Sequence, residues 1–136
     1  MDKAKALLAE AHELQEAGSR DGKHAARKEP VTERVKQAVE LAPNDPDTLF
    51  MATLILELYI SVFTDVARLA QEYQERLDRL GGPSDDILDI GGVSKADYER
   101  RRSSIKQTTG TGCLVTAVSS LAILVLITGL VIFSVQ

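Results

Sequence analysis

Apolar residues recur with a heptad spacing through the middle of the chain, between residues 49 and 80. Ten successive a and d positions are apolar or aromatic: Leu49, Ala52, Leu56, Tyr59, Phe63, Val66, Ala70, Tyr73, Leu77 and Leu80. This repeat predicts one long helix, over about residues 47–80, that packs against other helices at shallow angles.

The two halves of this helix differ in what surrounds the heptad stripe. Further apolar residues flank it before residue 63, whereas charged residues flank it after residue 66. We therefore expect the first half to be buried by other helices and the second half to be more exposed. The exposed stripe is a candidate protein-docking surface, formed by Val66, Ala70, Tyr73, Leu77 and Leu80.

Shorter helices are predicted on both sides of the long one. An apolar stripe predicts a helix over 2–17 that stops at Gly18, and a second helix runs from about Val31 to Leu41. The polar residues 18–30 between them predict an exposed loop with excess positive charge. After the long helix, residues 81–93 predict a linker from which Ile87, Leu88 and Ile90 can pack on the bundle. Ser94 and Asp97 then predict a capping box for a basic helix over about 95–107.

The last part of the chain has a different character. Residues 112–135 are 24 residues without a charge, which at about 1.5 Å per residue cover the roughly 30 Å hydrocarbon core of a bilayer. Only Gln136 follows, so we expect a tail-anchored protein. The predicted organisation is a helical domain (1–80), a linker with a basic juxtamembrane helix (81–107) and a transmembrane anchor (108–136).

The basic residues before this segment predict its orientation. Arg100, Arg101, Arg102 and Lys106 precede it, so the positive-inside rule places the N-terminal domain in the cytoplasm. Contact of these residues with anionic lipid is an alternative role, but topology alone explains them. The N-terminus is charged and lacks the apolar core that a signal peptide has.

Small residues recur every four positions in the predicted anchor, at Gly112, Thr116 and Ser120. Such spacing lets transmembrane helices approach closely. Hydrogen bonds from the Ser and Thr hydroxyls to their own helix explain the pattern equally well, so both interpretations stay open.

The composition argues against catalysis and against nucleic-acid binding. The formal net charge is −4, whereas nucleic-acid-binding proteins usually have a basic face. The single cysteine and the two histidines, His12 and His24, have no partners at the spacing of a metal site or a catalytic set. We expect no enzyme activity, no cofactor and no metal.

One short stretch resembles a known family. Residues 38–47 (AVELAPNDPD) place Ala38, Leu41 and Pro43 where tetratricopeptide repeats have A-x-x-L-x-P at the junction between two repeats. The resemblance covers at most residues 1–70. It implies a small TPR-like helical hairpin or bundle within an all-α fold, and a scaffold or adaptor that binds protein segments.

These features predict a non-enzymatic accessory or scaffold subunit of a larger membrane protein complex. We expect its partners to be a membrane protein complex or another transmembrane helix, together with the lipid bilayer, and a cytosolic protein is a further candidate. A free tail-anchored adaptor that recruits a cytosolic client is the first alternative. The second is a two-span, holin-like protein in which residues 49–63 also cross the membrane, although this run is short and contains Glu57.

Overall fold

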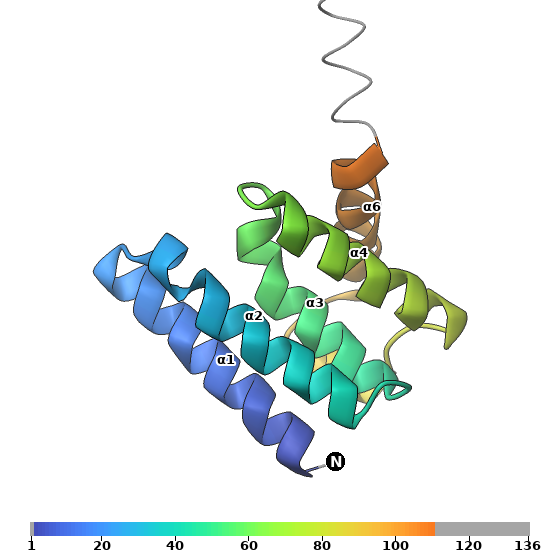
Figure 1. Ribbon diagram of the computed structural model, residues 1–136. Helices are drawn as coiled ribbons and strands as arrows, with labels where there is room; N and C mark the ends of the chain where they lie inside the picture. Colours follow the sequence, from blue (N-terminus) through green and yellow to red (C-terminus); the bar gives the residue numbers. More distant parts are fainter. Residues whose placement is uncertain (1, 111–136) are drawn as a thin grey trace, which may run out of the picture.

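The structure, a computed structural model, describes residues 2–110, and these residues form an all-helical bundle (Figure 1). The elements in chain order are α1 (Asp2–Asp21), α2 (His24–Leu41), α3 (Pro46–Ile60), α4 (Thr64–Arg79), α5 (Asp85–Ile90) and α6 (Lys95–Gly110). The expectation of an all-α protein is confirmed for this part of the chain. Within it, no helix combines the length and the apolar character that a membrane crossing requires.

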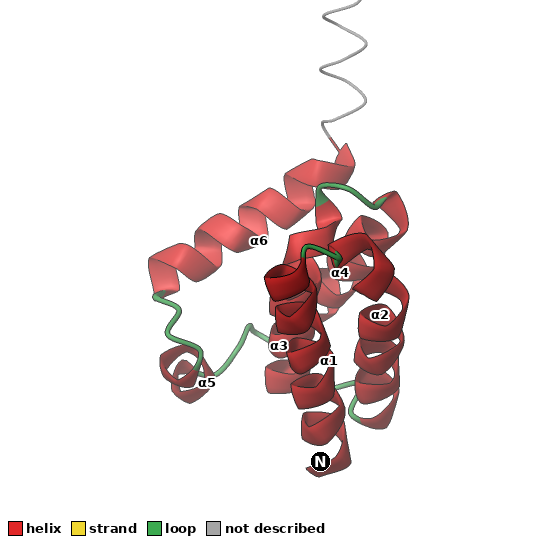
Figure 2. Cartoon of the chain, turned by 90° about the vertical axis from the view of Figure 1, so that its left-hand side faces the viewer, coloured by secondary structure: helices red, strands yellow, loops and turns green. Residues whose placement is uncertain are grey.

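The first four helices form two antiparallel hairpins, α1 with α2 and α3 with α4 (Figure 1). α3 lies against both helices of the first hairpin, and α6 crosses α4 and the side of α3 (Figure 2). One apolar core joins them, because buried residues extend from Ala4 on α1 to Ile105 on α6. The Gln15 side chain adds a buried polar link by donating a hydrogen bond to the Ile55 carbonyl at 2.8 Å.

The prediction of one long helix over 47–80 is wrong, because the chain reverses at residues 61–63. Phe63 has an extended conformation (φ −119°), and its N–H donates to the Tyr59 carbonyl at 2.9 Å. Ser61, Val62 and Thr64 are weak helix formers, so little helical stability opposes a break here. Eight of the ten stripe residues are still buried, since the two halves of the stripe face the same core from antiparallel helices; Phe63 is partly buried and Leu80 is exposed.

The predicted loop over 18–30 is also wrong, since only Gly22 and Lys23 separate α1 from α2. Gly22 has a positive φ (69°), and the Lys23 N–H donates to the Gly18 carbonyl at 3.0 Å, which ends α1 in a Schellman motif. A Cβ at Gly18 would lie 3.0 Å from Cγ of Arg27, so the glycine permits a close helix approach. Packing of α2 on α1 therefore outweighs the helix-breaking effect of Pro30, which is exposed.

The predicted helix starts after the α2–α3 and α5–α6 turns agree with the structure. Asp45 caps α3 by accepting from the Thr48 N–H at 3.0 Å, and Pro46 occupies its first turn. Ser94 accepts from the Asp97 N–H at 3.1 Å and donates to its carboxylate at 2.7 Å. The Asp97 carboxylate thus accepts a bond from the capping hydroxyl, which keeps it in the first turn of α6.

Candidate functional site: an apolar groove between α1, α3 and α5

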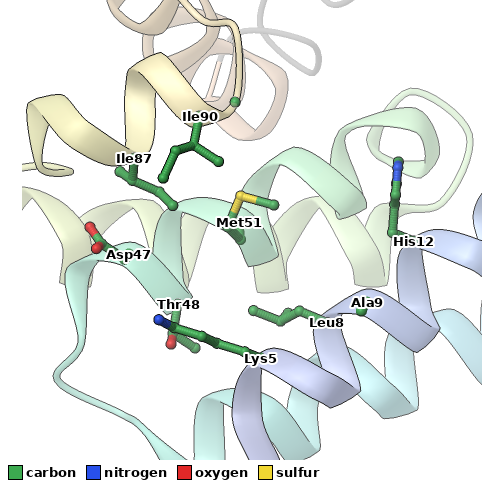
Figure 3. A pocket seen from close by; sticks show the side chains of 10 residues that line it. Lys5, Leu8, Ala9, His12, Asp47, Thr48, Met51, Ile87 and Ile90 are labelled. Atoms are coloured by element: carbon green, nitrogen blue, oxygen red, sulfur yellow. The ribbon is translucent and has the colours of Figure 1, made fainter. Parts of the chain in front are cut away.

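A groove of about 420 Å³ opens between α1, α3 and α5 (Figure 3). Its lining residues are Lys5, Leu8, Ala9, His12, Asp47, Thr48, Met51, Ile87, Ile90 and Gly91. Met51 points into the groove from α3, with Leu8 below it on α1 and Ile87 and Ile90 above it on α5 (Figure 3). The apolar side chains therefore line its interior from three helices.

The short helix α5 forms one wall of the groove, and hydrogen bonds and core packing hold it in place. The Ser84 hydroxyl accepts from the Ile87 N–H at 3.3 Å and donates to the Asp47 carboxylate on α3 at 2.9 Å. Leu88 is buried and joins the core. Gly92 (φ 62°) then allows the Val93 N–H to return to the Leu88 carbonyl at 2.9 Å. These contacts place Ile87 and Ile90 over α3.

The groove suits an apolar helical segment better than a small polar ligand. Ile90 is 81% exposed, so the wall presents a large apolar side chain to solvent. Met51 is a flexible, polarizable side chain that adapts to different apolar surfaces. Charged groups stay at the rim, with Lys5 on α1 and Asp47 on α3 (Figure 3). An apolar floor with a polar rim is typical of grooves that bind one face of an amphipathic helix.

The predicted docking stripe on α4 has a different environment from the one expected. Val66, Ala70, Tyr73 and Leu77 are between 0% and 4% exposed, and only Leu80 is largely accessible, at 41%. The expectation that the stripe is exposed is wrong. The hairpin turns α4 back onto the core, and α6 covers its far side. Burial also raises the pKa of Tyr73 to about 12, and the neighbouring Glu72 carboxylate acts in the same direction.

The basic cluster on α6 is largely engaged by the bundle itself. Arg101 pairs with Glu57 on α3, Arg102 with Asp78 on α4, and Lys106 Nζ lies 2.6 Å from Asp78 Oδ2. Arg100 pairs with Asp97 of its own helix and is the most exposed of the four. The structure thus brings three of the predicted topology residues together as a polar contact between α6 and the hairpin α3–α4.

Gly112, Thr116 and Ser120, the predicted packing face of the anchor, lie outside the described residues. Among residues 2–110, no group of three or more His, Cys, Asp or Glu side chains is placed to hold a metal ion. His12 lies on the rim of the groove, where its ring approaches Gln15 and Glu16 at 3.4 Å.

The groove itself could not be found from the sequence alone. Its residues come from three segments that are far apart in the chain, and α5 lies in the predicted linker. The only hint was the group Ile87, Leu88 and Ile90, which is too apolar for a solvated linker.

No family model, no curated protein and no solved structure matches this chain.

Proposed function

We propose that this protein is a non-enzymatic, single-pass membrane protein that acts as an accessory or scaffold subunit of a membrane protein complex. The observation that carries the proposal is the apolar groove between α1, α3 and α5, in a chain whose residues 112–135 carry no charge. The groove offers a site for a partner helix, and the uncharged segment has the length of a membrane anchor.

The finer features of the proposal rest on the sequence. The resemblance of residues 38–47 to a junction between tetratricopeptide repeats supports a TPR-like arrangement of the two hairpins. The basic residues Arg100 to Lys106 support an N-terminal domain in the cytoplasm, with the C-terminal segment as a tail anchor. In this topology the groove faces partners on the cytoplasmic side.

Substitution in the groove tests the proposal. Ile90→Glu places a charge at the groove wall, and Leu41→Glu changes an exposed apolar residue (51%, against 81% for Ile90) that does not line the groove. Full-length variants would be crosslinked in native membranes, purified in detergent and compared for the proteins that accompany them. We expect Ile90→Glu to lose the partner and Leu41→Glu to retain it. A full-length protein that runs alone in every case would contradict the proposal.

A free adaptor that recruits a cytosolic client is the second candidate, because the groove lies wholly within residues 2–110. Pull-down with residues 1–110 separates the two, and the core from Ala4 to Ile105 lies within this fragment. A soluble client retained by the fragment and lost with Ile90→Glu favours the adaptor. Loss of every partner without residues 111–136 favours the membrane-complex subunit.

A further inference from the structure

α6 crosses the α3–α4 hairpin, and its contacts with α3 advance in the same direction along both helices, while Lys106 near its end reaches Asp78 in the last turn of α4. Near the starts of α3 and α6, the Phe50 and Tyr98 rings are 5.7 Å apart, and further along both helices Glu57 pairs with Arg101. Both views show the last turn of α6 near the α3–α4 turn (Figures 1 and 2). α6 therefore ends on the side of the bundle that carries this turn.

Two large apolar side chains are exposed at this end. Leu58, in the last turn of α3, is 55% exposed, and Val62, in the α3–α4 turn, is 72% exposed. They are four residues apart and are separated from the groove, whose residues on α3 lie at its other end. The core accounts for neither of them.

The α1–α2 turn lies beside the α3–α4 turn and is basic. Lys28 Nζ is 2.6 Å from the Asp65 carboxylate and 4.9 Å from the centre of the Phe63 ring. Residues 20–28 hold four basic residues and one acidic residue, Asp21. Arg20 and Lys23 are exposed, and their side chains form no hydrogen bond or ion pair within the described residues. The α2–α3 turn at the opposite end is acidic instead, since residues 40–47 hold three acidic residues and no basic one.

We infer that this end of the bundle, formed by Arg20, Lys23, Leu58 and Val62, lies against the surface of an anionic lipid bilayer. The inference rests on the proposed membrane anchor, because α6, which precedes the uncharged segment in the sequence, ends on this side of the bundle. Leu58 and Val62 enter the interfacial region, while the two basic side chains contact lipid phosphates. Docking in this way fixes the orientation of the bundle and holds the groove at a defined height above the membrane.

An environment-sensitive fluorophore on the full-length protein tests the docking. Cys113→Ser removes the single cysteine, and Val62→Cys or Ile90→Cys then gives one labelling site at a residue that is mostly exposed. Each labelled protein is reconstituted into vesicles of phosphatidylcholine with or without phosphatidylserine. We expect blue-shifted, stronger emission at position 62 in the anionic vesicles and unchanged emission at position 90. Adding Arg20→Glu and Lys23→Glu should reverse the shift, with about a fivefold change in the docking equilibrium for each charge.

The outcomes separate this inference from the proposed anchor. If the protein floats with alkali-washed vesicles but positions 62 and 90 report the same aqueous environment, the docking is wrong and the anchor stands. An equal shift at position 62 in neutral and anionic vesicles would overturn the role of the basic residues. Loss of flotation would overturn the anchor and the docking together.

Discussion

Arg102 on α6 and Asp78 on α4 form a two-point ion pair. Arg102 Nε donates to Oδ1 at 2.8 Å and Nη2 donates to Oδ2 at 3.2 Å, while Lys106 lies beside the same carboxylate. Asp78→Asn removes the charge that both cations share. We expect it to lower the free energy of unfolding by about 1–2 kcal/mol at pH 7, since this carboxylate is largely screened from solvent. Urea denaturation of residues 1–110, followed by circular dichroism, measures this change.

Arg100→Ala is the matched control for this prediction. Its side chain is 78% exposed and pairs with Asp97 one turn away on the same helix. We expect a change within about 0.5 kcal/mol. An effect of Asp78→Asn no larger than that of Arg100→Ala would show that the ion pair does not hold α6 on the bundle.

The contribution of Asp78 to the free energy of unfolding should depend on pH. Burial disfavours its ionised form, but the hydrogen bonds from Arg102, Lys106 and Gln74 outweigh this effect and hold the pKa of Asp78 below its ordinary value of 3.8. The stabilisation is therefore present above the pKa of the unfolded chain and is lost as the pH falls through the lower folded pKa. We expect the difference between wild type and Asp78→Asn to be constant from pH 5 to 7 and to shrink below about pH 4. A difference of equal size at pH 3 would contradict it.

Two buried tyrosines give contrasting predictions for the same substitution. The Tyr98 hydroxyl accepts a hydrogen bond from the buried Gln74 amide at 3.1 Å, whereas the Tyr59 hydroxyl has no partner within residues 2–110. Tyr98→Phe should therefore cost about 1 kcal/mol, and Tyr59→Phe should be neutral or slightly stabilising. Denaturation of both variants under the same conditions measures the two changes in the free energy of unfolding. A loss of stability in Tyr59→Phe as large as that in Tyr98→Phe would indicate a water bound to the Tyr59 hydroxyl.

The sequence predicts the helices of this protein better than it predicts how they pack. The stops at Pro43 and Gly81, and the helix starts near Pro46 and Lys95, follow from residues that act on their own backbone. The reversal at Ser61 to Phe63 has no glycine or proline to mark it. A heptad repeat looks the same in one long helix and in two antiparallel ones, so the pattern alone could not distinguish them.

The candidate site was harder to predict for the same reason. The exposed stripe expected on α4 became core once the chain reversed, and the groove arose from α1, α3 and α5. Ionic contacts such as Glu57 with Arg101 join residues 44 positions apart, and sequence spacing does not reveal such pairs. The sequence of this chain therefore predicts local features such as helix starts and stops, whereas it does not predict surfaces that form only through tertiary contacts.

The three tyrosines of this chain should resist ionisation until the bundle unfolds. Tyr59, Tyr73 and Tyr98 are buried, and burial raises the pKa of each above 10, to about 12 for Tyr73. In the unfolded chain they ionise near pH 10. The folded state therefore binds more protons than the unfolded state between about pH 10 and 12, so stability falls as the pH rises through this window. Titration of residues 1–110 should show little tyrosinate absorbance at 295 nm at pH 10, and its later appearance should coincide with loss of helical circular dichroism. In 8 M urea all three should titrate near pH 10. Tyrosinate that forms near pH 10 while the helices remain intact would show that the bundle opens locally around these rings.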